Sequence, residues 1–156
     1  MEYRELGKTG MRISRLGFGG IPIQRIDAEG TKSLIRKLME AGVNYIDTAR
    51  GYTVSEEYLG YALEGVRDKF ILATKGRGLT REAMEADVAT SLRNLRTDYI
   101  DLYQFHNPSM DNLEKITAPG GDIYSSLPFA QYGYMSGTSM AAPYMSGVSA
   151  AMKQYL

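Results

Sequence analysis

Four short apolar segments recur along the first two-thirds of the chain at a nearly constant spacing. They begin at Leu16, Val43, Phe70 and Tyr99, which are 27, 27 and 29 residues apart. Their length and their β-branched and aromatic residues are typical of buried strands. Helical patterns fill the gaps, and strand–helix alternation of this period implies parallel βαβ units with right-handed crossovers. The repetition therefore predicts an α/β fold, either a (β/α) barrel or a doubly wound sheet.

The segments between the predicted strands carry helix signals. Residues 34–39 contain an apolar stripe, and Gly42 follows as a stop signal. Ser55 is the expected N-cap of a second helix and Thr80 that of a third. Residues 3–14 precede the first strand and are expected to form a small hairpin or arm, with glycine-containing turn chemistry.

Composition removes several classes of function. Lys and Arg number 18 and Asp and Glu number 18, a balance that favours neither nucleic acid nor an anionic membrane as a partner. There is no cysteine and only one histidine, His106, so we expect no disulfide, no thiolate catalysis and no metal centre rich in Cys or His. The N-terminal residues 1–5 lack the apolar stretch of a secretory signal, and no run is long enough to span a membrane. We expect a soluble, cytoplasmic protein.

Polar side chains with complementary chemistry lie where the predicted strands end. Asp47, Lys75 and His106 end or follow the second, third and fourth strands, and Tyr52 lies in the loop after the second. The carboxyl ends of strands in a parallel barrel share one face, where these groups would meet. An ammonium near a tyrosine stabilises its phenolate, and a carboxylate can hold the ammonium in place. Such a cluster could donate a proton to a carbonyl oxygen while the carbonyl carbon receives a hydride.

Each of these residues also has a local interpretation. Asp47 could cap the following turn, and Lys75 could be a solvated loop residue. His106 could make a local hydrogen bond, and Tyr52 could serve packing alone. Spacing alone leaves these alternatives open.

The segments 3–10, 16–20, 44–49 with Tyr52, 55–57, 73–75 and 91–106 together carry a resemblance to a known family. Through these segments, residues 1–116 resemble the N-terminal half of an aldo/keto reductase. The resemblance implies a TIM-type barrel, an NADPH cofactor that Asp47 helps to bind, and small carbonyl substrates. It also implies Tyr52 as the proton donor, Lys75 and Asp47 as the residues that tune it, and His106 as the residue that orients the carbonyl.

The chain departs from this family in its number of strands. The family has eight, and about four are visible here. We therefore expect a partial (β/α) TIM-type barrel of about four parallel strands, with a C-terminal loop and helix tail. Most of the loops that grip NADPH would be missing, so this truncated reductase module is expected to be inactive by itself. Open sheet edges would allow self-association.

Residues 117–156 differ in composition from the rest of the chain. Asp122 and Lys153 are their only charged side chains, and Gly, Ser, Ala, Met and Tyr dominate. Loop signals come first, and residues 139–156 could form one helix. Ser139 stands where that helix would begin, within the small-residue run 137–143. A serine there is either an N-cap or a nucleophile exposed at the positive end of the helix dipole.

This tail resembles the nucleophile segment of subtilisin-like serine peptidases. The matching stretches are 117–125 and 136–143, and the resemblance implies Ser139 as the acylated nucleophile. A serine nucleophile needs a histidine base and an aspartate. Asp47 and His106 precede Ser139 in the order of that family, but the reductase pattern already explains both residues.

The two resemblances divide the chain into an aldo/keto reductase-like half-barrel, 1–116, and a subtilisin-like C-terminal fragment, 117–156. The sequence 117–121 suits both families and would mark the junction. Three readings follow. The chain is a truncated oxidoreductase module, a serine endopeptidase fragment, or a chimeric chain without function.

Overall fold

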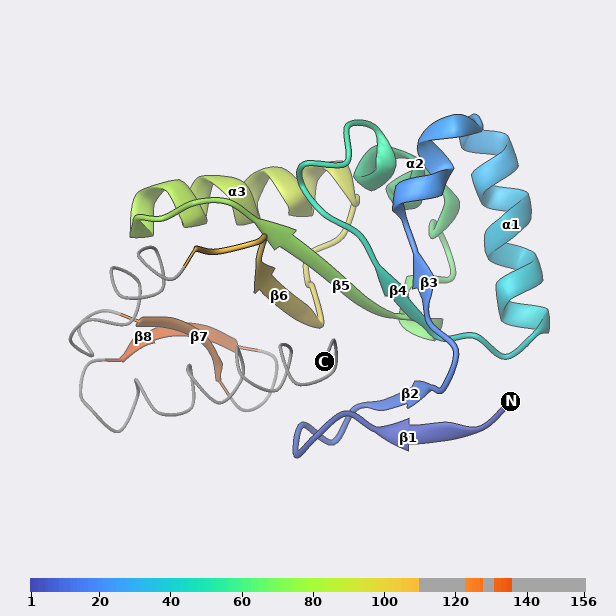
Figure 1. Ribbon diagram of the computed structural model, residues 1–156, viewed down its shortest axis with the longest axis horizontal. Helices are drawn as coiled ribbons and strands as arrows, with labels where there is room; N and C mark the ends of the chain where they lie inside the picture. Colours follow the sequence, from blue (N-terminus) through green and yellow to red (C-terminus); the bar gives the residue numbers. More distant parts are fainter. Residues whose placement is uncertain (110–122, 128–130, 136–156) are drawn as a thin grey trace.

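The computed structural model describes residues 1–109, 123–127 and 131–135. Its centre is a four-stranded parallel sheet with the strand order β3-β4-β5-β6 (Figure 1). The strands are β3 (Phe18–Gly19), β4 (Tyr45–Asp47), β5 (Ile71–Gly76) and β6 (Leu102–Phe105). Successive strands are neighbours throughout, so the sheet is the arc of a (β/α) barrel and not the doubly wound alternative, in which the order reverses.

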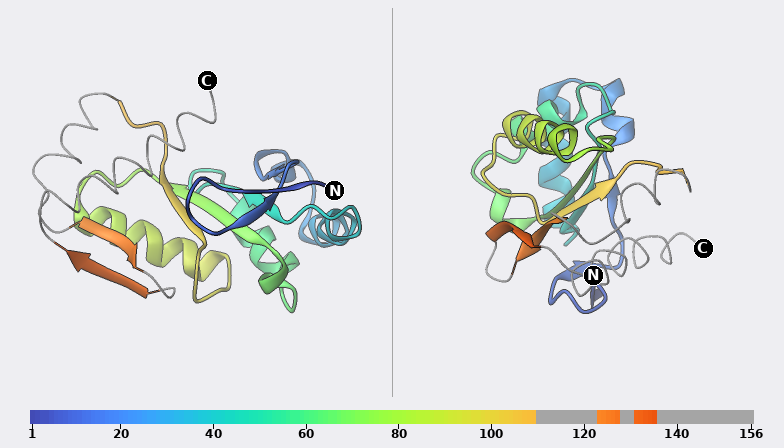
Figure 2. Two further views of the ribbon diagram at one scale, coloured as in Figure 1. Left: turned by 90° about the horizontal axis from the view of Figure 1, so that it is seen from below. Right: turned by 90° about the vertical axis from the view of Figure 1, so that its left-hand side faces the viewer.

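Three helices cover one side of this sheet. They are α1 (Ala28–Glu40), α2 (Ser55–Ala62) and α3 (Arg81–Asn94), and they form a row in chain order (Figures 1 and 2). Short 3₁₀ helices, η1 (Ile21–Arg25) and η2 (Arg67–Lys69), lie in two of the connections. None of the helices in the described part of the chain is long and apolar enough to cross a membrane.

The core lies between the helices and the sheet. Apolar side chains from both layers are almost completely buried there, and each contributes roughly 1.5–3 kcal/mol by leaving water. The buried carboxylate of Glu56 accepts hydrogen bonds from Thr74 (2.8 Å) and Asn94 (3.3 Å), which ties α2 to β5 and α3. The main apolar core residues are Ile23, Ile35, Ile46, Leu59, Leu63, Phe70, Leu72, Leu95 and Ile100.

The predicted hairpin at the start of the chain is confirmed. Strands β1 (Tyr3–Glu5) and β2 (Arg12–Ser14) pair antiparallel. Asn44 joins the hairpin to the barrel through its side chain. Its Nδ2 donates to the backbone carbonyl of Arg12 (2.9 Å), and its Oδ1 accepts from the Ser14 N–H (2.6 Å). The hairpin thus lies against the segment that enters β4, at the end of the sheet opposite the predicted site.

Of the two predicted N-caps, one is confirmed and one is wrong. Thr80 caps α3 as expected, since its hydroxyl accepts a hydrogen bond from the Ala83 N–H (3.2 Å). The prediction of Ser55 as an N-cap is wrong: the cap position of α2 belongs to Val54, without a side-chain cap bond. The buried Ser55 hydroxyl instead donates to the carbonyl of Gly20 (2.9 Å) and lies 2.8 Å from the Thr48 hydroxyl. Hydrogen bonds to residues of other elements thus take the place of the predicted cap bond within the helix.

Part of the tail differs from the predicted loop. Strands β7 (Ile123–Leu127) and β8 (Gln131–Met135) pair antiparallel, with Ser125 opposite Gly133. Both strands carry aromatic or β-branched residues, which favour extended backbone. The helix predicted over 139–156 lies outside the described residues, and the domain boundary at 116 stays a proposal.

Candidate functional site

Three of the predicted site residues lie at one edge of the sheet. Asp47 is the last residue of β4, Lys75 is the last but one of β5, and His106 follows β6 directly. The parallel pairing continues past the strand ends, because the His106 N–H donates to the carbonyl of Gly76 (2.8 Å) and the Arg50 N–H to that of Lys75 (2.9 Å). The ladder therefore holds these side chains at the carboxyl ends of neighbouring strands, as predicted.

Lys75 and Asp47 form an ion pair. The Lys75 Nζ lies 2.5 Å from Asp47 Oδ2 and also donates to the carbonyl of Thr48 at 2.7 Å. Their side chains are only 13% and 19% exposed, so water screens the pair weakly. Lys75 is thus not the solvated loop residue of the local interpretation. Asp47 does not cap the following turn, because its Oδ2 accepts from Lys75 and its Oδ1 has no partner among the described residues.

Tyr52 joins this pair from the loop between β4 and α2. Its ring centroid lies 5.3 Å from the Lys75 Nζ, which is within cation–π range. The ring also meets His106 edge-on, with centroids 5.5 Å apart and an angle of 88° between the planes. The structure thus brings together Asp47, Tyr52, Lys75 and His106, which the sequence separates by up to 59 residues.

His106 lies in an environment that favours its neutral form. Burial lowers the pKa of its imidazole below the ordinary value, and the positive charges of Arg77 and Lys75 lower it further, while Asp47 opposes them. Its Nδ1 is buried and has no hydrogen-bond partner within the described residues. The same holds for Asp47 Oδ1. One ring nitrogen of His106 and one oxygen of Asp47 therefore lack a hydrogen-bond partner, which a bound molecule could supply.

A hollow of about 350 Å³ opens beside His106. Apolar and polar side chains share its wall, which consists of Gly76, Arg77, Leu79, Phe105, His106, Asn107 and Pro108. Sequence reasoning missed Arg77. It stands two residues after Lys75, and because side chains alternate along a strand, the two belong to the same face of the strand path.

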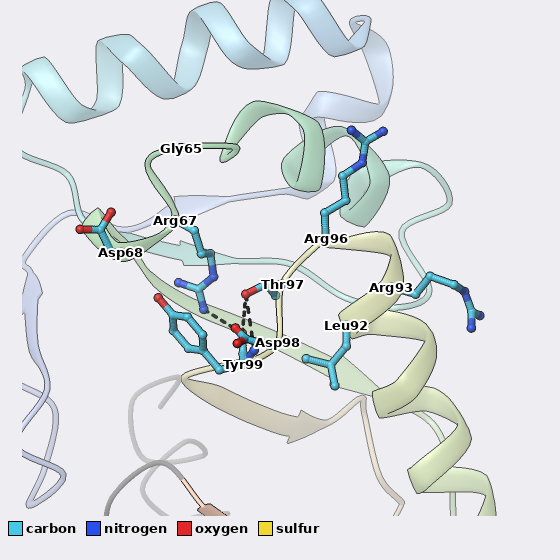
Figure 3. Close-up of a pocket in the computed structure, with 9 residues that line it drawn as sticks. All are labelled: Gly65, Arg67, Asp68, Leu92, Arg93, Arg96, Thr97, Asp98 and Tyr99. Carbon is cyan, nitrogen blue, oxygen red and sulfur yellow. Dashed lines mark hydrogen bonds between the residues drawn. The ribbon is translucent and has the colours of Figure 1, made fainter.

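A larger hollow of about 780 Å³ lies at the opposite, amino-terminal ends of β5 and β6 (Figure 3). The guanidinium groups of Arg93 and Arg96 point away from each other there. Arg67 is committed to Asp101 (2.6 Å) and to the carbonyl of Phe70 (2.7 Å). Arg93 donates to the Thr90 hydroxyl within α3, and Arg96 lies over the ring of Tyr61, so these arginines do not converge on a ligand.

Comparisons with known proteins point to one family. The model of the Aldo/keto reductase family matches residues 15–137, beyond the predicted boundary at 116 and short of Ser139. Aldo-keto reductase YhdN of Bacillus subtilis is 38% identical over 127 residues, which cover 69% of this chain and 38% of that protein. L-galactose dehydrogenase of Arabidopsis thaliana is 31% identical over 136 residues, 76% of this chain and 42% of its own length.

Solved structures give the same result. The holo form of aldo-keto reductase AKR11C1 from Bacillus halodurans superposes with a TM-score of 0.67 at 34% identity, over 74% of this chain and 45% of that one. An aldo-keto reductase from Klebsiella pneumoniae in complex with NADPH superposes with a TM-score of 0.60 at 27% identity, over 70% and 43%. The chain spans less than half the length of each of these relatives.

Proposed function

Because this chain belongs to the aldo/keto reductase family, we propose that it supplies the proton-donating part of an NADPH-dependent carbonyl reductase. The observation that carries the proposal is the cluster at the carboxyl ends of β4, β5 and β6. A lysine held by a carboxylate lies against the tyrosine ring, and a neutral histidine lies at the edge of that ring.

NADPH, when bound, supplies the hydride that reduces the carbonyl carbon. The Tyr52 hydroxyl donates a proton to the carbonyl oxygen, and the Lys75 ammonium stabilises the phenolate that remains. Asp47 holds Lys75 in place through Oδ2. A ring N–H of His106 donates a hydrogen bond to the carbonyl oxygen and orients it. A proton from water then restores the tyrosine.

The residues present fit a cofactor at this edge of the sheet. Asp47 Oδ1 is a buried acceptor without a partner among the described residues, and a hydroxyl or amide group of a bound dinucleotide would satisfy it. Two of the similar solved structures are described as complexes with NADP or NADPH. We assign Asp47 to cofactor binding on this basis, and a small carbonyl compound to the hollow beside His106.

We further propose that the 156 residues do not turn over without the remaining strands of a barrel. The sheet ends at β3 on one side and β6 on the other, and a closed barrel has no such ends. Self-association through these two edge strands stays a prediction, which sedimentation of the purified chain would check.

A hybrid barrel tests the proposed function. Residues 15–109 would replace the matching segment of the Bacillus subtilis relative, so that a complete set of strands surrounds the cluster. The hybrid is expected to oxidise NADPH in the presence of an aldehyde, whereas the purified 156-residue chain is not. A folded hybrid that binds NADPH but reduces no carbonyl compound would contradict the proposal.

The second candidate function rests on the run 137–143, with Ser139 as an acylated nucleophile. These residues lie outside the described part of the chain. Within that part, Asp47 is paired with Lys75 and His106 Nδ1 has no partner, so the carboxylate–imidazole bond of a serine peptidase triad is not formed. A fluorophosphonate probe is therefore expected to leave Ser139 unlabelled, and labelling that is lost in Ser139→Ala would support the peptidase.

The third interpretation, a chimeric chain without function, is tested by DNA sequencing. A single long DNA read across codons 107–125 in the source genome would show one uninterrupted gene if the two parts belong together. Reads that diverge within 117–121 would favour the chimera.

A further inference from the structure

Arg77 places a free positive charge next to the proposed reacting centre. Its backbone N–H and that of Gly78 both donate to Asp87 Oδ2 at 2.9 Å, which anchors the loop after β5 to α3. Within the described residues, no carboxylate pairs with its guanidinium. The backbone is thus fixed while the charged end remains available.

The guanidinium of Arg77 and the ring of His106 both lie beside Gly51. A β-carbon added at Gly51 would lie 3.7 Å from His106 Nδ1 and 3.8 Å from a terminal nitrogen of Arg77. Both are ordinary van der Waals distances, so a side chain at residue 51 would lie against both groups. Arg77 is also the only fully charged residue in the wall of the hollow beside His106, whose other side chains are apolar or neutral.

We propose that Arg77 binds an anionic group of the substrate, a carboxylate close to the carbonyl carbon, and thereby determines that the site takes oxo acids. This inference rests on the proposed function, because the carbonyl oxygen must meet Tyr52 and His106 while the carboxylate meets Arg77. A guanidinium suits this task, since its planar fork of N–H groups matches the two oxygens of a carboxylate.

The charges around His106 are consistent with this assignment. Arg77 and Lys75 face it as cations, and Asp47 as the single anion. Asp47 is already paired with Lys75, and Asp87 accepts from the backbone N–H of Arg77, so neither carboxylate serves the Arg77 guanidinium as a paired counterion. A bound carboxylate would supply one.

The single histidine of the chain makes the test direct. The imidazole signals of His106 are followed by NMR in the untagged 156-residue protein at constant chloride concentration, with pyruvate or pyruvamide added. These two probes have nearly the same shape and differ in charge. Pyruvate is expected to shift the His106 signals to saturation and to raise the His106 pKa, whereas pyruvamide is expected to do neither.

Two variants and a control locate the effect. Arg77→Gln is expected to raise the His106 pKa without ligand and to weaken pyruvate binding by about tenfold or more, as loss of a charge-assisted hydrogen bond does. Gly51→Ala is expected to weaken binding while it changes no charge. Arg93→Gln, which removes an exposed arginine of α3, should bind pyruvate as the unchanged chain does.

Equal shifts with pyruvate and pyruvamide, or unchanged pyruvate binding in Arg77→Gln, would overturn the assignment. Neither result depends on turnover. If the hybrid barrel reduces neutral aldehydes while pyruvate fails to bind, only the substrate class is wrong. If pyruvate binds through Arg77 but no hybrid reduces any carbonyl compound, the anion site stands and the proposed function fails.

Discussion

At the scale of single residues, the site depends on a lysine with two fixed acceptors. The Lys75 ammonium is bound to Asp47 and to the carbonyl of Thr48. These two bonds hold it against the Tyr52 ring and keep it from turning toward solvent. A charge held in this way needs no reorganisation when a phenolate forms beside it. The Lys75–Asp47 pair therefore positions the ammonium more than it stabilises the folded chain, because the Coulomb energy of a buried ion pair is largely offset by desolvation.

The titration of His106 makes stability depend on pH. Its pKa in the folded chain lies below the ordinary value of 6.5, so the unfolded chain binds a proton more readily as the pH falls. The stabilisation is complete above that ordinary value and is lost as the pH falls through the lower pKa of the folded state. We expect the free energy of unfolding, measured with urea, to fall from pH 7 to pH 5.

His106→Gln is the control, because it removes the titrating ring. Its stability should vary less over the same pH range. An equal slope in both proteins would show that other groups cause the dependence and that His106 is not held neutral.

Sequence reasoning could place some residues of the site and not others. Asp47, Lys75 and His106 could be placed because each adjoins a strand whose carboxyl end is visible in the hydrophobic pattern. The role of Ser55 could not, because its partners, Gly20 and Thr48, belong to other elements. Arg77 was missed for a similar reason, since its closeness to His106 exists only once β5 and β6 are paired.

At the scale of elements, α2 is fixed against the end of α3 by a glycine. A β-carbon at Gly60 would lie 2.2 Å from the carbonyl oxygen of Asn94, a backbone atom that cannot turn aside. Gly60→Ala favours the isolated helix by about 0.8–1.0 kcal/mol, but here it forces α2 and α3 apart. We expect a net destabilisation of roughly 1–3 kcal/mol, the usual cost of overpacking.

Gly19→Ala in β3 is the matched substitution, because nothing lies within 4 Å of the added carbon. Its midpoint of urea unfolding should move much less than that of Gly60→Ala. Similar midpoints for the two variants would mean that α2 and α3 do not pack as closely as described.

The periodicity of the sequence predicts the parallel strands but not the strands of the tail. The spacing of 27 to 29 residues predicts four parallel strands, and the structure confirms them in consecutive order. The pairing of β7 with β8 was not predicted, because five-residue strands without strict alternation resemble loops rich in Tyr and Ser.

At the scale of the whole molecule, the cluster proposed to be catalytic lies in a chain that spans less than half of the length of the matched relatives. Parallel strands place Asp47, Lys75 and His106 without help from the rest of a barrel, since the ladder bonds that position them lie between β4, β5 and β6, and Tyr52 joins them from the loop after β4. Gripping a cofactor and enclosing a substrate need surfaces that face this cluster. We therefore expect the cluster to be formed in the chain and its turnover to depend on further strands.

The most direct test of this account is the rate of NADPH-dependent aldehyde reduction by the hybrid barrel with Tyr52 and with Tyr52→Phe. General acid catalysis contributes about 10²–10⁴-fold, so the account predicts a fall in kcat of about 100-fold or more with NADPH binding unchanged. Tyr61→Phe, a tyrosine on α2 whose hydroxyl donates to Glu29, should reduce at nearly the original rate. A Tyr52→Phe hybrid that keeps its kcat would contradict the assignment of Tyr52 as the proton donor and, with it, the proposed function of the cluster.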